Sequence, residues 1–197
     1  MSTLQVALVV VVAAGAVLAC YSGEVAAERS GVVAMRGQPL TLVGQPVKVG
    51  DVAPAFKAVA NDLSTYEFKP EAGRVWILSA VPSLDTSVCS IETRRFNEEA
   101  TKLGKDVSIV TISMDLPFAQ KRWCGAEGVK NLQTVSDYRD RMFGEAYGVR
   151  IKENALLARA VFVVGKDGRI AYEQIVPELS KEPDYEAVLK AAREAGE

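Results

Sequence analysis

The sequence predicts one α/β domain, and three observations support this fold class. The segment at 74–81 is almost wholly apolar, which is typical of a strand buried on both faces of a sheet. A segment with helical spacing of apolar residues follows at 87–103, and a second apolar strand follows at 106–113. Such a strand–helix–strand order makes a parallel pair of strands. Further along, Lys166-Asp167-Gly168 separates two apolar segments and is a strong hairpin signal.

The first elements in chain order are short strands at 32–35 and 39–43. They flank Gly37-Gln38, which predicts a hairpin whose first turn residue is glycine. The helix at 87–103 is expected to end at Gly104, because glycine is common just past a helix C-terminus. The residues of this helix that are expected to face the core are Val88, Ile91, Phe96, Ala100 and Leu103.

A second helix is expected at 117–124, with Pro117 in its first turn and Gly125 directly after its end. The elements expected after it are a strand at 131–135, a helix at 138–147, strands at 160–164 and 170–176, and an amphipathic helix at 183–195. Together these elements predict a central mixed sheet with helices on both faces. This is the thioredoxin-like arrangement, here preceded by an N-terminal β-hairpin.

Composition excludes several classes of function. The chain has 197 residues with 23 Lys and Arg against 25 Asp and Glu, so it lacks the basic surface typical of nucleic-acid binding. It contains no histidine, which excludes Ser–His–Asp and Cys–His pairs and histidine-ligated metals. Three cysteines, at positions 20, 89 and 124, are too few for a disulfide scaffold or a cysteine-ligated metal site. We therefore expect no metal and no cofactor.

The N-terminal segment is read separately from the domain. Residues 4–19 carry no charge and are shorter than the ~20 residues of a comfortable membrane-spanning helix, which suits the apolar core of a signal peptide. The segment ends in Val17-Leu18-Ala19-Cys20, which resembles a bacterial lipobox, so Cys20 is a candidate for lipidation. We expect a leader at 1–19, a polar tether at 20–31 and a domain at 32–197.

Two features of the leader keep other interpretations open. No Lys or Arg precedes the apolar run, and Leu18 is unusual at its position in a lipobox. The alternatives are an uncleaved membrane anchor, an ordinary cleaved signal and a mis-chosen start codon. The expected location is the cell envelope or periplasm, with a membrane tether through Cys20, and the alternative location is the cytoplasm.

Cys89 is the candidate nucleophile because it follows an apolar strand and lies in the first turn of the predicted helix. Unpaired backbone N–H groups and the helix dipole favour a thiolate there. Thr86 can place its hydroxyl beside the sulfur, and Pro82 can shield it. Alternatively, Asp85 or Thr86 simply caps the helix, and Cys89 is a small buried apolar residue.

Cys124 is expected to be the poorer nucleophile, because the C-terminal end of a helix disfavours an anion. Cys89 and Cys124 are much further apart in the sequence than the cysteines of a CxxC motif. A disulfide between them requires Cα atoms within about 7 Å. We therefore predict local unwinding of one or both helices on oxidation.

The segment PSLDTSVC at 82–89 has the pattern Pro-x-x-x-Thr-x-x-Cys and resembles the active-site signature of peroxiredoxins. Four further segments, ETRRFN, MDLPFAQ, WCGAEG and EPDYE, narrow the resemblance to the bacterial thiol peroxidase group of atypical two-cysteine peroxiredoxins. The resemblance runs from about residue 32 to residue 189, which is essentially the whole predicted domain.

The resemblance implies a role for five residues. Cys89 matches the peroxidatic cysteine, which becomes a sulfenic acid, and Cys124 matches the resolving cysteine of the same chain. Thr86 matches the hydroxyl that binds thiolate and peroxide, and Pro82 matches the residue that screens the pocket. Arg159 stands directly before a buried strand, where its guanidinium could stabilise thiolate and developing oxyanion, although a surface cation at a strand start is the plain alternative.

The resemblance also implies partners: hydrogen peroxide and alkyl or lipid hydroperoxides as substrates, thioredoxin as reductant and a homodimeric assembly. The leader departs from the family pattern, so an exported protein would need a thioredoxin-like reductant outside the cytoplasm. Two rival functions stay open: a thiol-disulfide oxidoreductase on the same fold, which the missing CxxC motif disfavours, and a non-catalytic envelope lipoprotein.

Overall fold

The computed structural model describes residues 27–70 and 72–197. The predicted leader, the lipidation candidate Cys20 and most of the predicted tether lie outside the described residues. Within the part that is described, no helix is long and apolar enough to cross a membrane.

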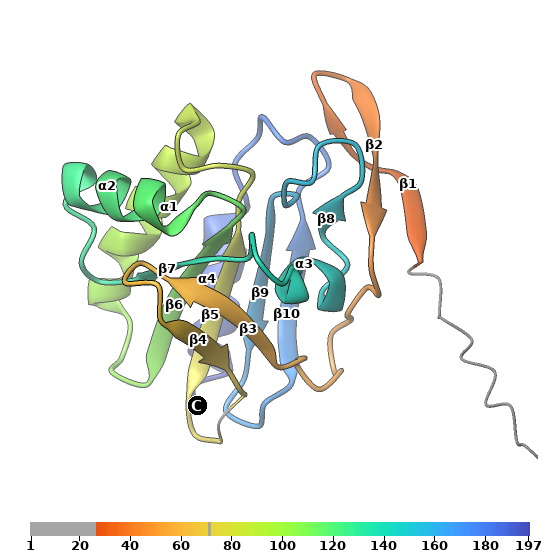
Figure 1. The fold of residues 1–197 in the computed structure, drawn as a ribbon. Helices are drawn as coiled ribbons and strands as arrows, with labels where there is room; N and C mark the ends of the chain where they lie inside the picture. Colours follow the sequence, from red (N-terminus) through yellow and green to blue (C-terminus); the bar gives the residue numbers. More distant parts are fainter. Residues whose placement is uncertain (1–26, 71) are drawn as a thin grey trace, which may run out of the picture.

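A seven-stranded mixed sheet forms the centre of the molecule, in the order β10-β9-β5-β6-β7-β3-β4 (Figure 1). Its strands are β3 (Phe56–Ala60), β4 (Thr65–Phe68), β5 (Val75–Ala80), β6 (Val107–Ser113), β7 (Gln133–Ser136), β9 (Ala160–Val164) and β10 (Ile170–Ile175). The pairs β5–β6 and β6–β7 are parallel, and the other neighbours are antiparallel. This confirms the predicted crossover and the hairpin of β9 and β10.

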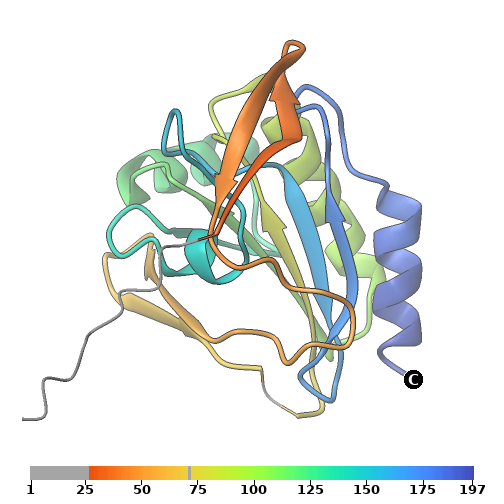
Figure 2. The same cartoon turned by 90° about the vertical axis from the view of Figure 1, so that its right-hand side faces the viewer.

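The helices lie on both faces of the sheet, as the sequence predicts. They are α1 (Ser87–Glu99), the 3₁₀ turn η1 (Ala100–Lys102), α2 (Pro117–Glu127), α3 (Met142–Ala146) and α4 (Tyr185–Glu194). One core cluster joins α1 and α4 to the sheet, with the rings of Phe96 and Tyr185 in edge contact at 5.3 Å. Figure 2 shows α4 along that flank of the sheet. The apolar face predicted for this last helix is buried.

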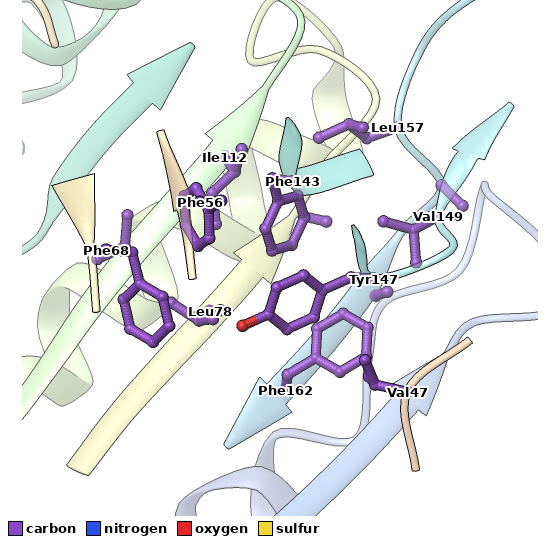
Figure 3. Close-up of a cluster of buried hydrophobic side chains, with 14 of the residues drawn as sticks. Val47, Phe56, Phe68, Leu78, Ile112, Phe143, Tyr147, Val149, Leu157 and Phe162 are labelled. Carbon is purple, nitrogen blue, oxygen red and sulfur yellow. The ribbon is translucent and has the colours of Figure 1, made fainter. Parts of the chain in front are cut away.

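The larger core cluster fills the opposite face. Aromatic rings of Phe56, Phe143, Tyr147 and Phe162 meet there at centroid distances of 4.6 to 6.3 Å (Figure 3). A small sheet in the order β1-β2-β8 covers this side, with β1 (Glu28–Met35), β2 (Gln38–Val43) and β8 (Arg150–Ile151). The strands β3, β4 and β8 were not expected from the sequence. Strands β4 and β8 are short, and β3 shows little of the alternation of apolar and polar residues by which a strand is recognised.

The first hairpin differs from the prediction by one residue. Its turn is Arg36-Gly37, with φ of 52° and 75°, and Met35 pairs with Gln38. Such a two-residue turn needs positive φ at both positions, and glycine takes the second one here. Strand β1 also starts at Glu28, so residues 28–31 belong to the sheet and not to a tether.

The two helices next to the cysteines also end elsewhere than predicted. Helix α1 ends at Glu99 and continues as a 3₁₀ turn, and Ile91, expected in the core, is 42% exposed. The buried face of α1 includes Cys89 and the polar Glu92, so it is not the wholly apolar face that the helical spacing predicts. Helix α2 runs through Gly125 to residue 127, and Gly128, with φ of 66°, ends it in the left-handed conformation.

Candidate active site

Cys89 is fully buried in the first turn of α1, beyond the C-terminal end of β5. Thr86 is the N-cap residue, with extended backbone, yet no side chain caps this helix. Instead, the Thr86 Oγ1 lies 2.9 Å from the Cys89 Sγ and 2.9 Å from the carbonyl oxygen of Ser83. Asp85 also does not cap α1, because its carboxylate faces the Arg122 guanidinium at 3.5 Å on the surface. The threonine hydroxyl carries a single proton, so the Cys89 sulfur and the Ser83 carbonyl oxygen are alternative acceptors for it.

Arg159 is the second donor to the sulfur. Its side chain is buried, with 1% exposed, which overturns the surface alternative. The Nη2 lies 3.3 Å from the Cys89 Sγ, and both Nη2 and Nε donate to the carbonyl oxygen of Leu179, at 2.9 and 3.2 Å. The guanidinium thus has a fixed orientation that aims one N–H at the sulfur.

Glu92 completes the buried group, and sequence reasoning assigned it no role. Its carboxylate pairs with the Nη1 of Arg159 and accepts a hydrogen bond of 2.8 Å from the Ser79 hydroxyl. Burial raises the pKa of Glu92 to about 6, although the guanidinium opposes this shift. Burial acts to lower the pKa of Arg159, but Glu92 and Cys89 outweigh it, so the pKa is raised and the cation persists. The sequence signal that could have identified Glu92 is its position three residues after Cys89, which places both residues on one face of the helix.

A cavity of about 220 Å³ leads towards this group. Its wall includes the buried Pro82, together with Thr86, Val88, Arg159 and Leu179. The tip of the β1–β2 hairpin contributes the outer wall. The structure therefore brings four of the five predicted residues together: Pro82, Thr86, Cys89 and Arg159.

Cys124 lies nearby in α2 and is half-buried. It packs on a small apolar cluster that contains Cys89 and Trp123, and both cysteines are free thiols. Its Sγ is 3.3 Å from the Thr134 hydroxyl. Burial raises the pKa of the Cys124 thiol against the opposing hydrogen bonds from Thr134 and Asn61, which disfavours its thiolate form. Cys124 is not the last helical residue, contrary to the prediction, since α2 continues to residue 127.

A polar network that the sequence did not reveal holds the loop before Cys89. The carboxylate of Asp115 accepts hydrogen bonds from the Ser83 hydroxyl at 2.7 Å, the Leu84 N–H at 2.8 Å and the Ser113 hydroxyl at 2.7 Å. Ser83 in turn supplies the carbonyl oxygen beside Thr86. Asp115 thereby fixes the loop that carries the threonine. Across residues 27–70 and 72–197, no three His, Cys, Asp or Glu side chains are grouped as a metal ion requires.

Comparisons with known proteins identify the family. The Redoxin profile matches residues 48–189, which is well over half of the chain. The chain belongs to the Redoxin family. Among its relatives, the thiol peroxidase of Bacillus subtilis is 53% identical over 161 residues, covering 82% of this chain and 96% of the relative. The thiol peroxidase of Listeria innocua is 55% identical over 163 residues, covering 83% and 98%.

Solved structures agree with this placement of the Redoxin domain. A peroxiredoxin-like protein from Aquifex aeolicus is 43% identical, with a TM-score of 0.79 over 86% of this chain and 98% of its own. A thiol peroxidase from Chromobacterium violaceum, at 19% identity and a TM-score of 0.73 over 82% and 95%, shares the fold. The resemblance to thiol peroxidases and the thioredoxin-like fold are confirmed. This Redoxin-family chain is a peroxidase, an oxidoreductase of the peroxiredoxin type.

Proposed function

We propose that the protein reduces hydrogen peroxide and organic hydroperoxides through a Cys89 sulfenic acid and an intramolecular Cys89–Cys124 disulfide, in antioxidant defence. The observation that carries this proposal is the buried Cys89 sulfur with two donors aimed at it, Thr86 at 2.9 Å and Arg159 at 3.3 Å. Donors in a water-poor pocket stabilise the thiolate and the negative charge that develops on peroxide oxygen.

In the first step, the Cys89 thiolate attacks the terminal oxygen of the hydroperoxide. The S–O bond forms and the O–O bond breaks, so the sulfur is oxidised by two electrons to a sulfenic acid. The leaving oxygen departs as alkoxide or hydroxide and takes a proton to become an alcohol or water. Arg159, kept cationic by Glu92, is placed to stabilise that leaving charge.

In the second step, the Cys124 sulfur attacks the Cys89 sulfur, the S–O bond breaks and water leaves. The shared apolar cluster of the two cysteines supports this pairing, and the predicted local unwinding would bring the sulfurs into bonding distance. A thioredoxin or thioredoxin-like dithiol then supplies two electrons, reduces the disulfide and becomes a disulfide itself.

The test is hydroperoxide turnover with a thioredoxin system, comparing the wild type with Cys89→Ser and Cys124→Ser. Cys89→Ser is expected to abolish turnover. Cys124→Ser is expected to undergo the first oxidation and to lose thioredoxin-linked turnover. Insulin reduction without peroxide consumption would instead favour a thiol-disulfide oxidoreductase, and a lack of any activity would favour a non-catalytic envelope protein.

We also propose that the protein is exported and tethered to the membrane through Cys20, and that it forms a homodimer. Support for the tether is the apolar run at 4–19 followed by the lipobox-like Val17-Leu18-Ala19-Cys20. Metabolic labelling with a palmitate analogue should label the wild type and not Cys20→Ala, and labelling of both would refute the tether. Sedimentation of the domain should give twice the monomer mass, and a monomer would refute the dimer.

A further inference from the structure

We propose that Gly125 is a weak point in the last turn of α2, residues 124–128, which lets this turn unwind so that Cys124 can reach Cys89. The inference rests on the proposed function, because it concerns the step in which the Cys89–Cys124 disulfide forms. It names the segment that moves and the residue that makes the movement easy.

The reduced fold gives no steric reason for a glycine at 125. The residue is helical, exposed and free of the positive φ that Gly128 adopts three residues later. A Cβ placed on Gly125 would meet no atom within 4 Å, whereas a Cβ on the buried Gly144 would lie 2.8 Å from Leu157 Cδ2. Alanine therefore fits at position 125. Relative to alanine, glycine in a helix shifts the equilibrium towards the unwound form by up to about fivefold.

Firm contacts hold the chain on the N-terminal side of this turn. Gln120 is fully buried, and its Nε2 donates to the Ser113 hydroxyl and to the Val135 carbonyl oxygen, both at 2.9 Å. Trp123, directly before Cys124, is only 7% exposed and belongs to the small apolar cluster. The N-terminal part of α2 is thus anchored to β6 and β7.

A second anchor follows the turn. The backbone N–H groups of Lys130 and Asn131 donate to the Asn97 Oδ1 at 2.9 and 2.8 Å, and the Asn131 side chain donates to the Asn97 carbonyl oxygen at 3.1 Å. These bonds tie residues 130–131 to α1. Movement between the two anchors can therefore occur while both flanking segments keep their contacts.

The turn itself is weakly held. Residues 125–128 are exposed, so their unwinding uncovers little apolar surface. The carbonyl oxygen of Cys124 accepts the N–H groups of Gly128 and Val129, which close the helix end. The ion pair of Glu127 with Arg94, at 3.0 Å, lies on the surface, where such pairs contribute little. Cys124 is held in addition by its packing on the small apolar cluster and by its contact with Thr134. Gly125 weakens the helical backbone that follows it.

Easy unwinding has a chemical consequence. A sulfenic acid that waits for its partner is exposed to a second peroxide, which oxidises it to a sulfinic acid that is not readily reversed. Fast release of Cys124 shortens that wait. The residues that contact the Cys89 sulfur before the first step, Thr86 and Arg159, lie outside this turn.

The test compares Gly125→Ala with Ala126→Gly, its reciprocal at the next exposed helical position, and with Gly104→Ala as a control. Gly104 lies outside any helix, and a Cβ there also meets no atom within 4 Å. After one equivalent of peroxide, stopped-flow fluorescence and thiol trapping report sulfenic acid and disulfide separately. Gly125→Ala should slow disulfide formation up to about fivefold and Ala126→Gly should accelerate it by a similar factor. The first oxidation should stay unchanged in all three.

Mass spectrometry after excess peroxide provides a second readout: more sulfinic acid in Gly125→Ala and less in Ala126→Gly. An unchanged rate of disulfide formation in Gly125→Ala, or a decrease in both helix variants, would overturn the inference while leaving the proposed function intact. Failure of the wild type to form a Cys89–Cys124 disulfide would overturn the proposed function and, with it, this inference.

Discussion

At the scale of single residues, the environment of Cys89 replaces the imidazole that this chain lacks. Thr86 supplies a neutral donor from the same helical turn, and Arg159 supplies a cationic donor from the start of β9. Glu92 keeps the guanidinium charged and oriented. Neither donor is a base that could take a proton from the thiol, so in the proposed mechanism the site acts by stabilising negative charge on sulfur and oxygen.

Thr86→Val removes the hydroxyl at nearly constant volume and should lower the rate of Cys89 oxidation by about 100-fold, the usual loss for one donor to a developing anion. Thr86→Ser keeps the hydroxyl and should restore most of the rate. Stopped-flow oxidation with hydrogen peroxide measures both. A threonine-like rate in the valine variant would contradict the role of the hydroxyl.

At the scale of elements, the N-terminal hairpin is part of the site. Glu178, in the loop after β10, accepts the N–H groups of Arg36 and Gly37 at 3.1 Å each. The same loop donates the Leu179 N–H to the Ala34 carbonyl oxygen at 2.9 Å and presents the Leu179 carbonyl oxygen to the arginine of the site. The hairpin tip and this loop thus form one wall of the cavity.

Glu178→Ala should loosen that wall and raise KM for a bulky hydroperoxide such as cumene hydroperoxide about fivefold, the value of one net hydrogen bond. Hydrogen peroxide is too small to depend on contacts with this wall, so its KM should change little. Steady-state kinetics with both peroxides tests this. The matched control is Glu186→Ala, an exposed glutamate in the first turn of α4 that should have no effect. Equal effects on both peroxides would show a general structural role.

At the scale of the whole molecule, the sheet separates two cores and collects the residues of the candidate site at one end. Cys89 follows β5, Asp115 follows β6 and Arg159 precedes β9, and these strands are neighbours in the sheet. Sites of α/β proteins commonly form beyond the carboxyl ends of parallel strands. The fold also buries carboxylates, and their titration makes the free energy of unfolding depend on pH.

Burial raises the pKa of Glu92 and that of Asp137 to about 6. Both values exceed those of the unfolded chain, so the folded protein binds more protons between about pH 4 and 6. The free energy of unfolding should therefore fall as pH rises through 6, by up to roughly 2 kcal/mol per group. Exposed carboxylates with a lowered pKa, such as Glu67, influence the free energy of unfolding only at lower pH, where they take up protons.

Urea denaturation at about pH 5, 6 and 7 measures this dependence. Asp137→Asn removes one of the two titrating groups and should flatten the decline. It also removes one of the two acceptors for the Phe143 and Gly144 N–H groups, which lowers the free energy of unfolding at every pH. A free energy of unfolding that rises steadily from pH 5 to 7 would contradict the assignment of raised pKa values.

Local patterns predicted much of the fold and of the site. The apolar strands, the crossover through α1, the second hairpin and α4 are visible because each depends on residues close together in the chain. Cys89 and Thr86 are separated by one helical turn, so their contact could be expected from spacing. The exact ends of α1 and α2 could not be predicted from spacing. A glycine ends a helix only where the backbone adopts the left-handed conformation, which Gly128 does and Gly125 does not.

By itself, therefore, the sequence determined the fold class and, through its resemblance to thiol peroxidases, the class of enzyme, and it predicted Cys89 as the nucleophile. Only the tertiary structure decided that Arg159 is buried beside the sulfur, that Glu92 is its partner and that Asp115 holds the reactive loop. Each of these contacts joins residues far apart in the chain. Their charged side chains look like ordinary surface groups in a sequence, because burial and pairing are properties of the packed fold.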